Sequence, residues 1–573
     1  GGDELARFGN ATFSALTTAQ AAALRADQAA QLETADLAAL GTAQVRALSS
    51  SLLTALNADQ LGAFTSDQLR AISVTQLRAI EADDLAGLSS ADLGTLLTAQ
   101  LAALSTAQLN ALSPEQLVGL STDQVSRLSA AQVASLDPSR LAGMGTLQFS
   151  GLSSAQVGAL STAQVQALEA ADIAALGSAQ IRALGTAQVI AMGGDQLGAI
   201  TATQAPGLTT AQLRAIEIDD IGSLSTALLA ALSSAQLVGF SSAQLAAMSA
   251  EQLAELSTQQ LSALSTAQIA AMSPDQINAL GSEALSRLTT AQVAALTSDQ
   301  IGALTGDNLA GLTPAQVAAL RTAQIEALNG DNLPSLTTAQ AAALGTAQVR
   351  ALEAADLALM ETADLAALST AAVAALREAQ IDALTGEQLA ALTSAQLRAL
   401  GTAGLARLGA DDIGSLTPDQ VAALSTAQVA TLTGAQFGAF GSDDLAALTT
   451  AQMAALSPTN LASLAADAVT GFTTAQIAAL SSTALRALSG EQLGALEPAQ
   501  FAMLGTAQLA ALTPAQIAEL AGGHLAALSS TQSSPISVAT KASKTAAASR
   551  RRANTKSPFC SICSTARGAT SFH

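Results

Sequence analysis

The chain has 573 residues, of which 50% are hydrophobic, 2% aromatic and 12% charged, and its formal net charge is −21. An average globular domain is about 25% charged, so this composition excludes an ordinary enzyme domain with a charged surface and a charge-rich disordered chain. No apolar run approaches the roughly 18 residues that a membrane-spanning helix needs, so we expect no transmembrane segment.

Residues 1–528 repeat with a period of eight. Residues 161–168 read STAQVQAL, and the next segments read EAADIAAL, GSAQIRAL and GTAQVIAM. The register reaches back to Gly1 and forward to Leu528 without an insertion or deletion, which makes 66 octads. Position 8 is always Leu, Ile, Met or Phe, and position 5 is almost always Leu, Ile or Val. Position 7 is usually Ala, position 4 Gln or Asp, and position 1 Ser, Thr or Gly.

Each octad is predicted to start a new short helix. Ser or Thr at position 1, followed three residues later by Gln or Glu, is the capping-box pattern. Eight of the ten prolines in the array fall at position 2, where a helix tolerates the missing N–H. We therefore predict a helix over positions 2–8 with position 1 as its N-cap. Gly at position 1, as in Gly177 and Gly185, is expected to end one helix while opening the next.

A two-turn helix is not stable alone in water, so Leu at positions 5 and 8 and Ala at position 7 must pack against other octads. The predicted fold is all-α: a solenoid or superhelix of about 66 short capped helices, one per octad. A continuous helix fails, because eight residues turn about 80° beyond two full turns. A β-solenoid stays open as the alternative, although Ala and Gln are poor strand formers. Pro206 and Pro334 stand at position 6 and predict local irregularity in octads 201–208 and 329–336.

The sequence predicts no catalytic, cofactor-binding or metal-binding residue in the array, and therefore no enzyme. Four pairs of acids occupy positions 3 and 4, where the positive end of a helix explains them. His524, the single His of the array, takes position 4 and is interpreted as a capping residue. Arg recurs at position 6, which we interpret as an exposed face. The acid pairs are Asp83-Asp84, Asp219-Asp220, Asp411-Asp412 and Asp443-Asp444, and the arginines are Arg46, Arg70, Arg78, Arg182, Arg214, Arg350, Arg398 and Arg486.

Residues 529–573 form a second region, without Asp or Glu and with seven basic residues. Residues 529–532 start a 67th octad, but Ser533 and Ser534 then replace the expected Leu-x, and we expect the pattern to end there. We predict a basic disordered tail over 529–573, with a translated frameshift and a genuine tail both open. Cys560 and Cys563 have a zinc-like spacing. Only His573 could join them, whereas structural zinc needs four ligands, so no metal site is predicted.

The octads TTAQIAAL (473–480), TTAQVAAL (289–296) and STAQIAAM (265–272) resemble those of bacterial low-complexity proteins with tandem LTTAQIAAL-type repeats. Such proteins often carry haem-utilisation or adhesion labels. The resemblance covers residues 1–528 and implies the repeat type, but it supplies no functional residue. The haem label has no support here, because the array has one His and no Tyr.

These observations favour a non-enzymatic structural repeat protein, a bacterial surface or secreted rod, stalk or adhesin region; a peptide- or ligand-binding α-solenoid scaffold is the alternative. Residues 1–528 carry a net charge of −28, which disfavours nucleic acid, so we expect other proteins or a cell surface as partners. The array has no Cys and fits an extracellular or cell-surface location. The chain begins at Gly1 without Met, so we expect a fragment.

Overall fold

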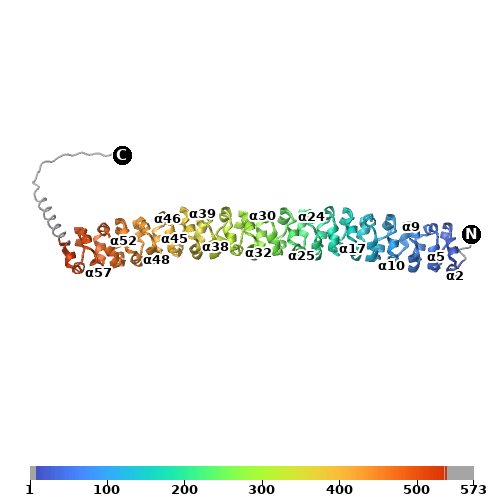
Figure 1. The fold of residues 1–573 in the computed structure, drawn as a ribbon, viewed down its shortest axis with the longest axis horizontal. Coiled ribbons are helices and arrows are strands. Elements are labelled where there is room, and N and C mark those ends of the chain that lie inside the picture. The colour runs from blue at the N-terminus through green and yellow to red at the C-terminus, as the bar shows by residue number, and fades with distance from the viewer. Residues whose placement is uncertain (1–7, 535, 538–573) are drawn as a thin grey trace, which may run out of the picture. The chain divides into compact units, whose positions relative to one another are not determined.

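The computed structural model describes residues 8–534 and 536–537. The chain divides into two units, residues 1–304 and 305–573, and each is built in the same way. Figure 1 shows short helices following one another in chain order within each unit. No residue of the described ranges is in a strand, so the all-α prediction is confirmed and the β-solenoid is excluded there.

One octad shows how the sequence makes the repeating element. Helix α19 spans Thr162–Ala167, and Ser161 is its N-cap with φ −72° and ψ 159°. The Ser161 hydroxyl accepts a bond from the Gln164 N–H, and the Gln164 side chain accepts one from the Ser161 N–H, which completes the predicted capping box. Leu168 is extended, with φ −69° and ψ 143°. Position 8 therefore lies outside the helix, and the prediction of helix over positions 2–8 is wrong at its last residue.

The same boundaries recur along both units. The α-helices begin at position 2 and end at position 5, 6 or 7, as in α11 (Thr98–Leu101), α16 (Pro138–Ala142) and α48 (Pro418–Ala423). Two longer helices, α32 (Gly281–Arg287) and α46 (Gly401–Arg407), begin at position 1. The eight position-2 prolines start helices as predicted; they are Pro114, Pro138, Pro274, Pro314, Pro418, Pro458, Pro498 and Pro514.

Two local predictions have different outcomes. The octads of Pro206 and Pro334 are irregular as expected, because each forms a 3₁₀-helix, η3 (Ala202–Gly207) and η5 (Leu333–Ser335). Gly177 and Gly185, however, have φ of −81° and −77°, so they do not end the preceding helix in the left-handed conformation. Other 3₁₀-helices occur without Pro: η1 (Ala26–Gln31), η2 (Asp83–Gly87), η4 (Ile218–Ser223) and η6 (Ala468–Gly471).

The helices stack with a spacing of three octads. Helix α16 contacts α19 in the first unit, and α48 contacts α51 (Ser442–Ala447) in the second. Side chains from positions 5 and 8 fill the interior, where Val165 is 0% and Leu168 5% exposed. Small residues at positions 6 and 7 permit close approach: a Cβ on Gly87 would lie 1.8 Å from the Ala58 carbonyl oxygen.

The repeat conformation continues past Leu528. Residues 530–534 are helical, and Gln532 donates to the carbonyls of Ala502 and Leu504 at 2.7 and 2.8 Å. Ile536 stands at position 8 of this 67th octad and is 6% exposed, so the pattern does not end at Ser533 as expected. The rest of the predicted tail, including Cys560, Cys563 and His573, lies outside the described residues.

Candidate functional site

The most regular polar feature is a ladder of buried amides at position 4. Gln164 is 1% exposed, and its Nε2 donates to the carbonyls of Val133 at 2.9 Å and Leu136 at 2.8 Å. Those acceptors stand at positions 5 and 8 of the octad four repeats earlier. The same pair of bonds, to residues 31 and 28 positions back, recurs at Gln204 in the first unit and at Gln380 in the second.

Each such Gln thus has two tasks. Its side-chain oxygen caps its own helix, while its NH₂ group satisfies two carbonyls that no helix bond would otherwise serve fully. Helices that are three octads apart in sequence are in contact, and the amides bond to carbonyls four octads earlier. Each superhelical turn therefore holds between three and four octads. We call this pair of amide–carbonyl bonds the position-4 tie.

Sequence reasoning found the capping half of this arrangement and missed the tie. A signal was present: Gln holds position 4 in 43 of the 66 octads, whereas a carboxylate, Asp or Glu, holds it in only ten. A carboxylate would cap the helix and suit its positive end equally well. The preference for Gln therefore indicates that the amide donor is used.

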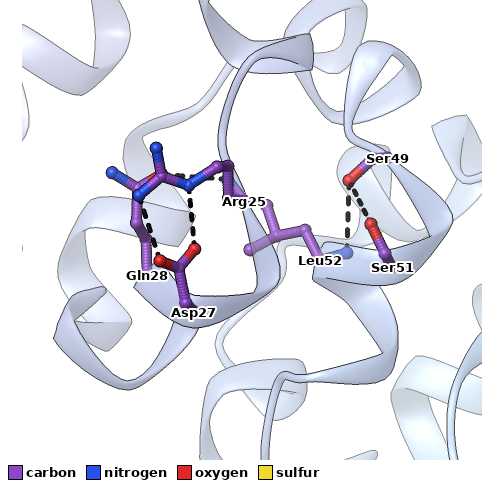
Figure 2. A network of polar contacts seen from close by, with 6 residues as sticks. All are labelled: Arg25, Asp27, Gln28, Ser49, Ser51 and Leu52. Carbon is purple, nitrogen blue, oxygen red and sulfur yellow. Dashed lines mark hydrogen bonds and ion pairs between the residues drawn. The ribbon is translucent and has the colours of Figure 1, made fainter.

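Figure 2 shows the two halves of the capping box separately. Arg25 cannot cap with its side chain, and only its backbone N–H donates, to Gln28 Oε1 at 2.9 Å, while its guanidinium pairs with Asp27. In the other octad Ser49 Oγ accepts from the Leu52 backbone N–H at 3.2 Å. Leu52 stands at position 4 and has no side-chain amide, so the other half of the capping box is missing. A helix therefore forms with either half alone, so capping by itself does not require Gln.

Position 6 supplies bonds in the forward direction. Arg70 and Arg78 donate from Nε to the carbonyls of Thr95 at 3.1 Å and Ala103 at 2.8 Å, three octads later. Asn110 makes the equivalent bond to Ser135 at 2.7 Å. The face is exposed as predicted. Several of its arginines, including Arg182 and Arg398, are nevertheless bonded to a neighbouring helix rather than free in solvent.

Aspartate at position 4 changes the chemistry of the tie. Asp444 Oδ2 accepts from the Gly441 N–H at 3.0 Å, which confirms the capping interpretation of this acid pair. A carboxylate cannot donate to the carbonyls behind it. Burial raises the pKa of Asp172 to about 6, the cap to the Glu169 N–H lowers it, and the Glu169 charge raises it. Burial is also the main cause that raises the pKa of four more position-4 aspartates, Asp84, Asp356, Asp364 and Asp444.

His524 reproduces the cap and one of the two bonds of the tie with an imidazole. Its Nδ1 accepts from the Ala521 N–H at 3.2 Å, and its Nε2 lies 2.6 Å from the Leu496 carbonyl. The ring is 4% exposed and meets Phe501 edge to face at 5.3 Å. This pattern requires the neutral tautomer with the proton on Nε2. The predicted capping role is confirmed, and an interoctad bond is added to it.

None of the described residues forms a cluster of three or more His, Cys, Asp or Glu that could hold a metal ion. The four acid pairs therefore stay at separate helix starts and do not converge. Within the same residues, no helix has the length and apolar character that crossing a membrane requires.

A family model decides the relationship of the chain. The model of the ALTTAQ repeat matches it in tandem, through overlapping segments that cover more than half of its length. The matched residues are 29–66, 85–122, 107–138, 136–170, 165–202, 213–250, 226–258, 246–282, 276–306, 306–338, 357–394, 391–426, 421–450, 472–506 and 491–522. The chain belongs to the ALTTAQ repeat family. No curated protein matches it.

The letters of the family's repeat motif correspond to the residues of the capping box and the position-4 tie. In ALTTAQ lettering the Leu is position 8, the next Thr is the N-cap, and the Gln is the tie residue, as Leu288, Thr289 and Gln292 show here. Gln292 caps the Thr289 N–H at 2.8 Å and donates to Leu264 at 2.7 Å. The motif thus contains both the residue that starts each helix and the residue that bonds this helix to the octad four repeats earlier. The match establishes a tandem-repeat protein and carries no haem or adhesion role.

Proposed function

We propose that the chain is a non-enzymatic structural repeat protein that serves as a bacterial surface or secreted stalk, spacer or adhesin region. The observation that carries this proposal is the position-4 tie. The most regular polar side chain of the repeat makes its hydrogen bonds within the chain. Gln164 and Gln380, for example, cap their own helices and bond to an earlier octad. A repeat whose polar groups serve its own assembly is suited to holding a shape over a distance.

The surface composition supports the same role. Positions 1, 2, 3 and 6 are exposed and carry mainly Ser, Thr, Ala and Gly, with acids outnumbering bases. A net negative surface keeps such a chain soluble and repels phosphate backbones. The array also lacks Cys and so tolerates an oxidising exterior.

The test is exposure on intact cells. Cells that make the protein are treated with an external protease and probed with an antibody to the repeats, with a cytoplasmic protein as the control. We expect loss of the repeats from intact cells while the cytoplasmic control survives. Digestion only after lysis would refute the surface role.

A ligand-binding solenoid is the second candidate, and grooves between octads favour it. One of about 910 Å³ lies between octads 489–496 and 513–520, where Gly490 and Gly494 remove side chains. Another of about 740 Å³ lies between octads 169–176 and 193–200, beside Gly193 and Gly194. Grooves of this size are in the range that binds small molecules or peptide side chains. Saturable binding of a peptide to the full chain would support this candidate over the stalk.

A further inference from the structure

Octad 401–408 departs from the repeat at its start and at position 4. Leu400 keeps helical angles, with φ −61° and ψ −22°, and Gly401 follows with φ +69°, a left-handed conformation that favours Gly. Position 4 is Gly404, so this octad has no side chain to make a tie. The junction also weakens a later tie, since Gln428 Nε2 lies 3.3–3.5 Å from the carbonyls of Leu397, Arg398 and Gly401.

A cavity of about 280 Å³ lies where the missing amide belongs. Val373 and Leu376 line it, and they precede Gly404 by 31 and 28 residues, the spacing at which Gln380 bonds Val349 and Leu352. Among the residues that the structure describes, none donates a hydrogen bond to the Leu376 carbonyl. The cavity therefore retains the acceptor that a tie would satisfy.

The other walls define what could enter. Ile381 and Leu400 supply apolar surface and are 7% and 8% exposed, more than most core side chains. Arg407 also lines the cavity, and it is bonded to Glu378 at 2.7 Å and to both carboxylate oxygens of Asp382. These contacts use three of its five N–H groups and leave two for a further acceptor. The three charged groups together carry a net charge of −1.

We propose that this cavity binds a primary carboxamide. Its NH₂ group donates to the Leu376 and Val373 carbonyls, its oxygen accepts from a spare Arg407 N–H, and its alkyl part packs on Ile381 and Leu400. An ammonium would be attracted to the surplus negative charge, but the Glu378 side chain is 80% exposed, so the ion would stay hydrated outside the cavity. A carboxylate would face carbonyl oxygens and two acids. The carboxamide is either a small free molecule or the Gln side chain of a partner. The inference does not depend on the stalk role.

The experiment measures binding of propionamide, which has the end of a Gln side chain, to the full-length protein by saturation-transfer NMR. We expect saturable binding, and at least tenfold weaker binding of propionate and of N,N-dimethylpropionamide, which has no N–H donor. Absence of saturable propionamide binding, or equal binding of the dimethyl compound, would overturn the proposal.

Two variants locate the site. Ala403→Leu fills the cavity mouth from an exposed position and should weaken propionamide binding at least tenfold. Its matched control is Ala395→Leu, at the same position of a neighbouring octad that has Gln396, and it should change binding less than twofold. Equal effects of the two variants would place the binding elsewhere and refute this site.

Gly404→Gln gives the octad its own carboxamide and should abolish binding. A Cβ there lies 3.1 Å from Leu400 Cβ, so Ala403→Leu decides the outcome if this variant does not fold. The source of the amide is tested with a blocked tripeptide, acetyl-Ala-Gln-Ala-N-methylamide. Binding at least tenfold tighter than propionamide identifies a partner's Gln, and weaker binding identifies a free amide.

Discussion

The position-4 tie makes a sharp prediction at Gln164, which has no charged residue in its own octad. Gln164→Glu keeps an oxygen for the Ser161 N–H but replaces the donor by a carboxylate oxygen facing the carbonyls of Val133 and Leu136. An uncompensated buried charge typically costs about 3–5 kcal/mol. Gln164→Leu removes three hydrogen bonds without adding charge, and at about 0.5–1.5 kcal/mol each it should cost about 1.5–4.5 kcal/mol.

The assay must report local stability, because a long repeat array does not unfold in one cooperative step. Amide hydrogen exchange of the peptides covering residues 129–168 provides it. Since about 1.4 kcal/mol is tenfold, Gln164→Glu should speed exchange there by about a hundredfold or more at pH 7. The control is Gln166→Glu, the same change at an exposed position of the same octad, for which about a twofold effect is expected. Equal effects of the two substitutions would refute a stabilising tie.

Four further predictions follow from the same geometry. The pKa of Asp172 is raised to about 6, above about 3.9 for an exposed Asp, so local stability should rise as pH falls from 7 through 6 and level off near pH 4. Asp172→Asn should remove this pH dependence in hydrogen exchange and stabilise the octad at pH 7, since Asn460 in the same position bonds Leu432 at 2.8 Å. His524→Gln should preserve the hydrogen-exchange protection of octad 521–528, whereas His524→Leu should lower it, because only Gln replaces both ring bonds. Pro206→Ala should raise local stability by about 1 kcal/mol through a restored α-turn; unchanged exchange would show that Pro206 is not the cause of the 3₁₀ geometry of η3. Deleting octad 289–296 should lower the hydrogen-exchange protection of the flanking octads less than deleting three of its residues, since only the whole octad restores the register; equal losses would refute a shared core.

The local part of the fold was predictable because it depends on neighbours in sequence. The capping residue Ser161 and the position-2 proline Pro418 mark the helix starts, and the Leu at position 8 marks the core. The partner of Gln164 was not predictable in the same way. Its acceptor at Leu136 depends on how many octads make a superhelical turn, which is set by packing between octads and leaves no mark within one octad. The extended angles of Leu168 have the same origin, because they turn the chain toward the next helix.

The forward bonds at position 6 illustrate a further limit. An Arg repeated on one face predicts exposure, and Arg78 is exposed, but its Nε also bonds Ala103 three octads ahead. Arginines at position 6 give the same sequence pattern whether their side chains only face solvent or also bond to a neighbouring helix. Only the stacking distance between helices distinguishes them, since a long side chain can lie across a neighbour while its charged end stays in water.

The octads that lack Gln at position 4 distinguish replacements that only maintain the stack of helices from a replacement that creates a binding site. The carbonyls of the octad four repeats earlier then lack the Gln amide, and the outcome depends on what replaces Gln. Leu228 fills the space with a buried apolar side chain, whereas Asn460 and His524 each restore one bond, to the position-8 carbonyl. Gly404 fills nothing and leaves a cavity with an acceptor at Leu376. A structural spacer tolerates any of these replacements, because the ties of the neighbouring octads continue to stabilise the stack of helices. A site can arise only where the replacement leaves both room and an unused hydrogen-bonding group, as it does at Gly404.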